Sequence, residues 1–286
     1  PLDISDTERT CPFGIRFKRK VGADKFGADE AVRGPLEGAK TEKDILDYSF
    51  PDPNWFDFTS LLSETEAYKD KVIVGGMWSG ILGDSYRMHG FQNFLLNLAM
   101  NPKLIKTLVN RMTDFYLELN ERLFRTVKDT LDIFFFGNDF GSQNGLLFSK
   151  DQWDEIFRDN YRKLIDLAKS YGYRVMTHSC GSVVELMDRF VDLGIDIIDP
   201  VQTTAQGMEP KALKQQFGDK LVFHGGIDTQ HVLPKGTREE VKNHVEETIS
   251  VLGKNGGYIM VSCNSLQEDT PVENIDIMYR TAREYI

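Results

Sequence analysis

The sequence predicts an α/β fold, a (β/α)8 TIM barrel, from two features of its 286 residues. Short apolar runs bounded by glycine or polar residues recur along the chain, and amphipathic helical patterns lie between them. Repeated alternation of strands and helices favours a parallel sheet covered by helices. Single barrels of this type commonly reach this length. We therefore expect residues 1–286 to form one domain, irregular over 1–70 and built of regular strand–helix repeats over 71–286.

Apolar runs with the length and composition of buried parallel strands occur after residue 70, since each is short and rich in β-branched or aromatic residues. They are Lys71–Gly76, Leu131–Gly137, Tyr173–Thr177, Ile195–Asp199, Leu221–His224 and Gly257–Ser262. A barrel of eight strands needs two more, and we expect one within Cys11–Lys18 and the other upstream of Pro1. A doubly wound open sheet is the alternative, but no glycine-rich phosphate-binding turn follows the first run.

The segments between these runs carry start and stop signals of helices. Ser or Thr followed three residues later by Gln or Glu has the spacing of a capping box, glycine commonly follows the last turn, and proline suits the first turn. In chain order the signals are Asn101-Pro102, Ser149 with Gln152, Gly172, Thr237 with Glu240, Gly253, and Thr270-Pro271. The first of these helices is predicted to bury one stripe of side chains, namely Leu104, Leu108, Met112, Phe115, Leu119 and Leu123.

Composition restricts the functional class. The net charge of −10 argues against a nucleic-acid partner, which requires a basic face. No stretch approaches the roughly eighteen consecutive apolar residues of a membrane span, and the polar opening of the sequence has no secretory signal. Three cysteines do not form a disulfide framework. We expect a cytoplasmic protein with free thiols and with neither nucleic-acid nor membrane partners.

Soft metal-ligand residues follow two of the predicted strands. His178 and Cys180 come just after one strand, and Cys263 comes just after another. In a barrel the C-terminal ends of all strands open on one face, where the active site lies. One imidazole and two thiolates converging there form an open zinc site with a fourth position for water or substrate. The alternative is two buried, inert cysteines and a histidine of the core.

Two further strand ends carry polar residues. Asp139 and Gln143 follow the run that ends at Gly137, and a carboxylate in such a position is a candidate acid or base. Asp139 alternatively satisfies backbone N–H groups in a turn. His224 is followed by two glycines, which permit close approach of a ligand to the backbone or simply form the turn.

These motifs, in this order, resemble the uroporphyrinogen decarboxylase superfamily. The resemblance covers roughly residues 70–286 and rests on GNDFGSQNGLLFS, THSCGSVVELMDRFVDLGIDIIDPVQ, LVFHGGIDTQ and YIMVSCNSLQEDTPVENI. More closely, the chain resembles the branch of zinc-dependent methylcobalamin:thiol (coenzyme M-type) methyltransferases and corrinoid-dependent demethylases. The family fold is a TIM barrel. In this branch a His-x-Cys pair and a distant cysteine bind zinc, and these positions match His178, Cys180 and Cys263.

The resemblance implies a zinc-dependent methyltransferase that moves a methyl group between a corrinoid (cobalamin) carrier protein and a small-molecule thiol or a methoxy or methylamine substrate. Asp139, Gln143 and His224 then orient the substrate or the metal ligands. The alternative is a metal-free tetrapyrrole decarboxylase. Such enzymes carry an RQAGRY-like segment, which these 286 residues lack, and a strand-end aspartate for which Asp139 is the nearest match. A third interpretation is a barrel that only binds a corrinoid or a porphyrin.

Overall fold

The six apolar runs found in the sequence are strands in the structure. These strands are β5 (Val74–Gly75), β6 (Ile133–Gly137), β7 (Arg174–His178), β8 (Ile197–Val201), β9 (Val222–Ile227) and β10 (Tyr258–Ser262). Helices lie between them in the chain, so the predicted α/β class is confirmed. The runs are recognisable because they are short, rich in β-branched or aromatic residues and bounded by glycine or polar residues. Of these strands, β8 is buried at every position, whereas β5 and β10 contain no fully buried residue.

The computed structural model describes residues 2–5, 7–19 and 29–285, and these fall into two units that are described separately below. The first unit contains Pro1–Leu131 and Asp151–Leu167. The second contains Asp132–Lys150 and Ala168–Ile286. No helix among the described residues combines the length and the apolar character that crossing a lipid bilayer requires.

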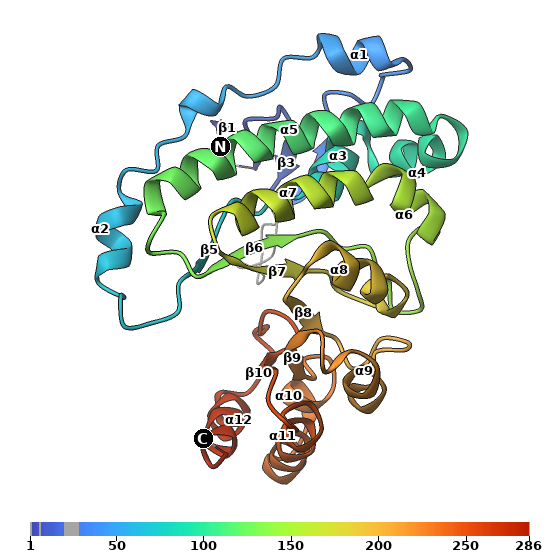
Figure 1. Ribbon diagram of the computed structural model, residues 1–286. Helices are drawn as coiled ribbons and strands as arrows, with labels where there is room; N and C mark the ends of the chain where they lie inside the picture. The colour runs from blue at the N-terminus through green and yellow to red at the C-terminus, as the bar shows by residue number, and fades with distance from the viewer. Residues whose placement is uncertain (1, 6, 20–28, 286) are drawn as a thin grey trace. The chain divides into compact units, whose positions relative to one another are not determined.

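The second unit is a curled parallel sheet with helices between its strands (Figure 1). Its strands lie in the order β10-β9-β8-β7-β6, so each strand pairs with the next one along the chain. This succession of parallel neighbours is that of part of a TIM barrel, although the described residues of this unit do not form all eight strands. The register places His178 opposite Gly137 on one side and opposite Asp199 on the other.

The helices of the second unit follow its strands. They are η2 (Val184–Leu186), α8 (Met187–Leu193), α9 (Pro210–Phe217), α10 (Val232–Lys235), α11 (Arg238–Leu252) and α12 (Val272–Arg283). Thr237 and Glu240 form the predicted capping box at the start of α11, and Gly253 is its C-cap. The inner faces of α11 and α12 bury Val241, Val245 and Met278 against the end of β9 and α10. This core fixes the strand ends that carry the polar residues described below.

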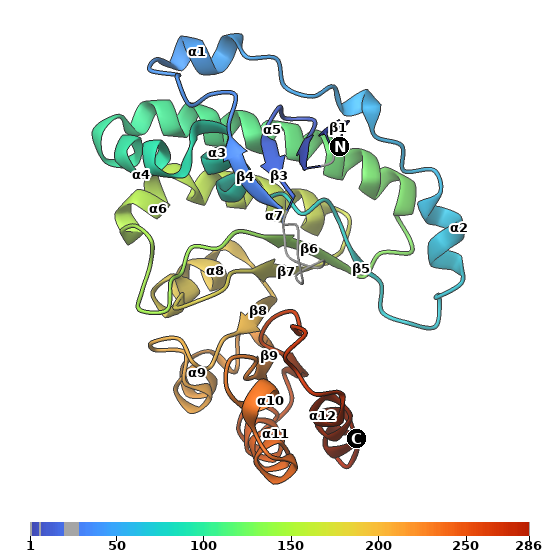
Figure 2. The same cartoon turned by 180° about the vertical axis from the view of Figure 1, so that it is seen from behind.

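The first unit is organised around α5 (Pro102–Val127), which begins after Asn101 as predicted, with the Asn101 side chain accepting the backbone N–H of Leu104. The predicted stripe from Leu104 to Leu123 is buried along α5. Both cartoon views show shorter elements around this helix (Figures 1 and 2). These are α1 (Glu42–Asp47), η1 (Pro53–Trp55), α2 (Leu61–Glu66), α3 (Ile81–His89), α4 (Phe91–Met100), α6 (Lys150–Ile156) and α7 (Arg158–Ser170).

The prediction that residues 1–70 are irregular was wrong for their N-terminal part. A four-stranded antiparallel sheet forms there from β1 (Leu2–Ser5), β2 (Glu8–Thr10), β3 (Arg16–Lys18) and β4 (Glu30–Arg33). The barrel strand expected within Cys11–Lys18 is instead β3, which pairs antiparallel with β2 and β4. These strands have three or four residues and carry charged side chains, such as Arg16 paired with Glu8 at 2.5 Å. Such strands show no apolar alternation that a sequence pattern can detect.

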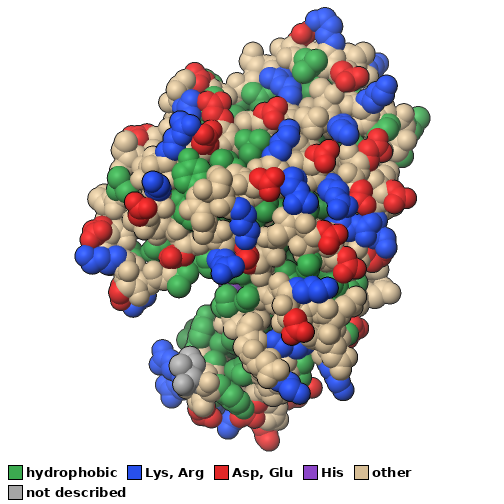
Figure 3. All heavy atoms as spheres, viewed as in Figure 1, with side chains coloured by type: hydrophobic (Ala, Val, Ile, Leu, Met, Phe, Trp, Pro, Cys, Tyr) green, Lys and Arg blue, Asp and Glu red, His purple; other side chains and the backbone are tan. Residues whose placement is uncertain are grey.

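The surface of the molecule mixes both signs of charge. Acidic and basic side chains are interspersed on the face shown in Figure 3, with apolar side chains between them. Several of the cations belong to ion pairs, such as Lys169 and Arg174 on Asp196 in the second unit.

Candidate functional site

Two loops at the C-terminal ends of β6 and β7 pass each other in close contact. The backbone N–H of Ser182 donates to the carbonyl of Ser142 at 2.7 Å. Glycine is required where they cross, because a Cβ on Gly141 would lie 2.7 Å from the Cys180 carbonyl oxygen. A Cβ on Gly181, whose φ is +84°, would lie 2.6 Å from the Ser142 oxygen. The two glycines thereby let the β6 and β7 loops approach closely enough to share a site.

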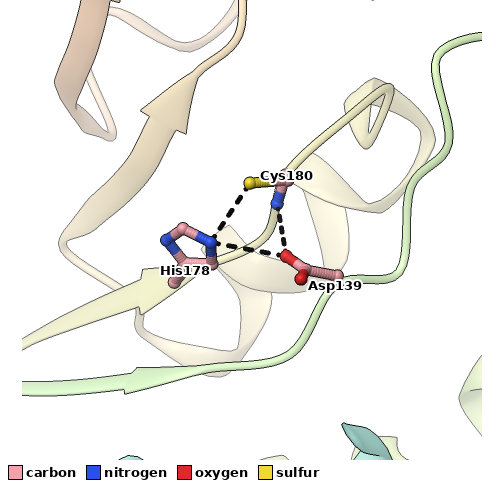
Figure 4. Close-up of side chains that lie close together, drawn as sticks. All are labelled: Asp139, His178 and Cys180. Carbon is pink, nitrogen blue, oxygen red and sulfur yellow. Dashed lines mark hydrogen bonds and ion pairs between the residues drawn. The ribbon is translucent and has the colours of Figure 1, made fainter. Parts of the chain in front are cut away.

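The crossing brings Asp139, His178 and Cys180 together, with their potential ligand atoms within 4.8 Å of one another. His178 Nε2 lies 3.2 Å from Cys180 Sγ and 3.4 Å from Asp139 Oδ1. Asp139 Oδ1 also accepts the backbone N–H of Cys180 at 2.9 Å. Figure 4 shows the three side chains pointing toward one another from the ends of the two strands. Among the described residues this is the group of His, Cys and acidic side chains with the spacing of a metal site.

A carboxylate that the sequence analysis did not select lies behind this cluster. Asp199, in β8, hydrogen-bonds His178 Nδ1 through Oδ2 and His224 Nδ1 through Oδ1, both at 2.5 Å. Its side chain is only 10% exposed, so little water reaches the carboxylate and the two imidazoles are its main polar partners. The signal that could have revealed it is the aspartate that ends the strand run Ile195–Asp199.

The environment shifts the protonation equilibria of the cluster. Burial lowers the pKa of the His178 imidazole, but hydrogen bonds with Asp139, Asp199 and Cys180 outweigh burial and raise that pKa to about 11. Burial raises the pKa values of the Asp139 and Asp199 carboxyl groups. Hydrogen bonds from His178 and the Cys180 N–H bring the pKa of Asp139 below its usual range, and hydrogen bonds from His178 and His224 do the same for Asp199. Both carboxylates are therefore ionised at neutral pH and act as acceptors.

Cys263 lies directly after β10, as expected, but outside the group of three. The residue is 3% exposed, and Sγ donates to the carbonyl of Val201 at 3.0 Å. Burial raises the pKa of the Cys263 thiol to about 11. The next residue does reach the cluster, because Asn264 Nδ2 lies 3.5 Å from Cys180 Sγ. The structure thus brings His178 and Cys180 together and holds the Cys263 thiol on a neighbouring carbonyl.

Gln143 belongs to a network of side-chain amides beside the cluster. Gln202 Nε2 donates to Gln143 Oε1 at 3.1 Å, and Gln202 Oε1 accepts the backbone N–H of Gly181 at 2.9 Å. Gln143 Nε2 in turn donates to the carbonyl of Thr204. These bonds connect the loops after β6, β7 and β8, and Gln202 is a second residue that the sequence analysis missed.

The donor set of the cluster suits a borderline metal ion. An imidazole nitrogen, a thiolate sulfur and a carboxylate oxygen are the three ligand types that zinc takes in proteins. A histidine that binds zinc usually donates its other ring N–H to a carboxylate, as His178 does to Asp199. Fold and site together define an α/β chain with part of a parallel barrel and a candidate metal centre at its strand ends.

The family is established by sequence. The model of the uroporphyrinogen decarboxylase (URO-D) family matches residues 41–285. The chain therefore belongs to the uroporphyrinogen decarboxylase family, as the motifs indicated.

One known protein is similar to this chain in sequence, and another is similar in structure. A uroporphyrinogen decarboxylase of Trichodesmium erythraeum (strain IMS101) is 26% identical over 147 residues, which is 51% of this chain and 39% of the relative's length. A methyltransferase from Methanosarcina mazei has a similar structure, with a TM-score of 0.67 at 18% identity, over 96% of this chain and 76% of that protein. At this identity the second likeness shows a shared fold.

Proposed function

We propose that this protein is a zinc-dependent methyltransferase that moves a methyl group between a corrinoid (cobalamin) carrier and a small molecule. The observation that carries the proposal is the grouping of Asp139, His178 and Cys180, with ligand atoms within 4.8 Å of one another at adjacent strand ends. Membership of the URO-D family and the fold shared with a methyltransferase support it. The small molecule is a thiol acceptor or a methoxy or methylamine donor.

The residues present fit zinc. His178 and Cys180 offer nitrogen and sulfur 3.2 Å apart, and Asp139 offers an oxygen in the same group. We assign Cys263 as a further ligand, which requires its thiol to leave the carbonyl of Val201. Bound zinc supplies Lewis acidity, which lowers the pKa of a thiol or polarises a donor oxygen.

The other polar residues orient reactants around this centre. The Asp139 side chain is 59% exposed, so its second oxygen is accessible to a substrate hydrogen-bond donor. Gln143, held by Gln202 and Thr204, presents an uncharged amide on the same loop after β6. His224 is held through Nδ1, which leaves Nε2 for the substrate or a water molecule. We assign these three residues to substrate positioning and proton transfer.

The partner implied by this reaction is a corrinoid carrier protein, because the methyl group must be delivered to or taken from cobalt at the rim of the sheet. We propose neither a nucleic-acid nor a membrane partner, in keeping with the net charge of −10. Reduced cysteine thiols at the metal centre suit the cytoplasm, where we place the protein.

The test has two readouts on one purified sample. Zinc per chain is measured by inductively coupled plasma mass spectrometry, and about one equivalent is expected for a single site of this type. Methyl transfer from methylcobalamin is then followed by its visible spectrum with a panel of thiols, and demethylation is followed with methoxy and methylamine donors. A protein that binds no zinc and transfers no methyl group in either direction would refute the proposal.

A metal-free tetrapyrrole decarboxylase is the second candidate, supported by the family match and by the T. erythraeum decarboxylase. In that reaction Asp139 would meet the pyrrole N–H groups with its exposed carboxylate. Turnover of uroporphyrinogen by zinc-depleted protein, lost in Asp139→Asn, would favour this candidate. The same activity unchanged in Cys180→Ala would strengthen it, because a decarboxylase has no use for the thiol.

A further inference from the structure

We propose that Asp199 is a positioning residue that holds the imidazoles of His178 and His224 in one tautomer and one orientation. The role of Asp199 in catalysis rests on the proposed function, whereas its effect on the two imidazole rings does not. Asp199 lies in β8, between β7, which carries His178, and β9, which carries His224. A single carboxylate therefore serves a metal ligand on one side and a substrate-orienting residue on the other.

The geometry divides the carboxylate between the two rings. Oδ2 contacts His178 Nδ1 and Oδ1 contacts His224 Nδ1, each at 2.5 Å. Neither oxygen is shared between the rings, and the side chain is only 10% exposed. Since His178 and Asp199 are register partners on adjacent strands, the first contact is fixed by the sheet itself. The N–H of Ser179, bonded to the Asp199 carbonyl at 2.7 Å, holds the two strand ends together.

The chemistry follows from the acceptor character of a carboxylate. An ionised carboxylate only accepts hydrogen bonds, so each Nδ1 must carry a hydrogen. Nε2 is then the nitrogen of each ring that is left to coordinate a metal or to take part in proton transfer. For His178 this is the atom that lies 3.2 Å from Cys180 Sγ and 3.4 Å from Asp139 Oδ1. The carboxylate thus turns the metal-binding nitrogen toward the other ligands.

Replacement of Asp199 by asparagine separates this role from simple packing. Asparagine has nearly the same volume, but one of its two terminal groups donates rather than accepts. It can therefore accept an Nδ1–H from only one of the two rings. Asp228→Asn is the matched control, because Asp228 is an equally buried carboxylate after β9 that contacts His231 instead of these two imidazoles. Asp199→Glu keeps the charge but moves it by one methylene.

The experiment measures the Nδ1–H groups of the two imidazoles and the zinc affinity separately. In wild type, nitrogen-15 NMR should show two slowly exchanging Nδ1–H signals, assigned with His178→Gln and His224→Gln. Asp199→Asn should lose at least one signal and bind zinc about 10–100-fold more weakly in a competition with a chromophoric chelator. Asp199→Glu should also weaken zinc binding, whereas Asp228→Asn should keep both Nδ1–H signals.

Each outcome decides one question. Both Nδ1–H signals retained in Asp199→Asn, or zinc affinity of Asp199→Glu equal to that of wild type, would overturn the proposal. If wild type takes up no zinc but Asp199→Asn loses a ring signal, the positioning role stands and the zinc-dependent function falls. Should Asp199→Asn fail to fold, two other variants carry the test. Asp199→Glu should bind zinc more weakly than wild type, and His224→Gln should bind zinc as tightly as wild type.

Discussion

The side-chain amide of Asn264 contacts the sulfur of Cys180 at 3.5 Å, which links the loop after β10 to the loop after β7. Cys263 immediately precedes Asn264, yet its own thiol hydrogen-bonds the Val201 carbonyl and is not part of the Asp139–His178–Cys180 group. This relationship makes the identity of the third ligand a question for substitution experiments.

Cys263→Ala should lower zinc affinity more than the 10–100-fold that is typical when a residue behind a ligand is lost. Methyl transfer should fall with it. The fold should persist, because alanine after the end of β10 removes only one buried thiol and leaves the strand intact. Competition with a chelator measures the zinc affinity, and circular dichroism measures whether the fold persists. Asp139→Asn is the comparison: if it loses zinc while Cys263→Ala keeps it, the third ligand is the carboxylate and the cysteine assignment is wrong.

Zinc affinity should increase with pH. The pKa of His178 is raised to about 11, and that of the Cys263 thiol also to about 11, so both are protonated at neutral pH. Zinc binds only the deprotonated groups and must release these protons. Isothermal titration calorimetry in two buffers of different ionisation enthalpy counts the protons released. A zinc affinity that is flat between about pH 6 and 9 would contradict this assignment of ligands.

Asp196→Asn should destabilise the second unit by about 1–2 kcal/mol at neutral pH, through loss of a charged acceptor. Burial raises the pKa of Asp196, but bonds from Lys169, the Val175 N–H and Arg174 outweigh it and lower the pKa. Because the folded pKa is depressed, the stabilisation is complete above the unfolded value of about 3.9 and disappears as pH falls through the folded pKa.

Thermal unfolding of wild type and Asp196→Asn at a series of pH values tests this. The difference in midpoint should be constant near neutral pH and shrink below about pH 4. A difference in midpoint that grows on acidification would show that folding does not lower the pKa of Asp196.

Gly181→Ala should disrupt the site, and Gly172→Ala provides a matched control. Both glycines have a φ of +84°, so alanine strains the backbone equally, by about 1–2 kcal/mol. A Cβ at Gly172 meets nothing within 4 Å, whereas at Gly181 it meets the backbone of Ser142 and Gly141 below 3 Å. Only Gly181→Ala should lower zinc affinity, measured by chelator competition. Equal effects of the two substitutions would mean that the loop crossing does not matter for the metal.

The sequence predicted the strands of the parallel sheet because each coincides with a short apolar run bounded by glycine or polar residues. It also indicated that His178, Cys180 and Cys263 follow strand ends, since strand boundaries are marked by glycine and polar residues. The two cysteines do follow β7 and β10, whereas His178 is the last residue of β7 itself. It did not predict the antiparallel sheet of β1 to β4, whose strands are too short and too polar to show a pattern.

Asp199 was missed for a different reason. It ends an apolar run and was counted with the strand core, whereas its role depends on the register between β7 and β8, which pairs it with His178. Register is a property of two segments 21 residues apart, and the composition of either segment alone does not reveal it. Gln202 was missed likewise, because its partners lie on the loops after β6 and β7.

The amides of Gln143 and Gln202 join three rim loops without any ionic group. Salt screens interactions between charges but leaves hydrogen bonds between neutral groups largely intact. The relative placement of these loops should therefore survive concentrated salt, in which docking of the proposed corrinoid carrier weakens. Raising the ionic strength would then dissociate that carrier while leaving the rim loops in place. Under the proposed function, turnover with free methylcobalamin in high salt would separate methyl transfer from delivery of the cofactor.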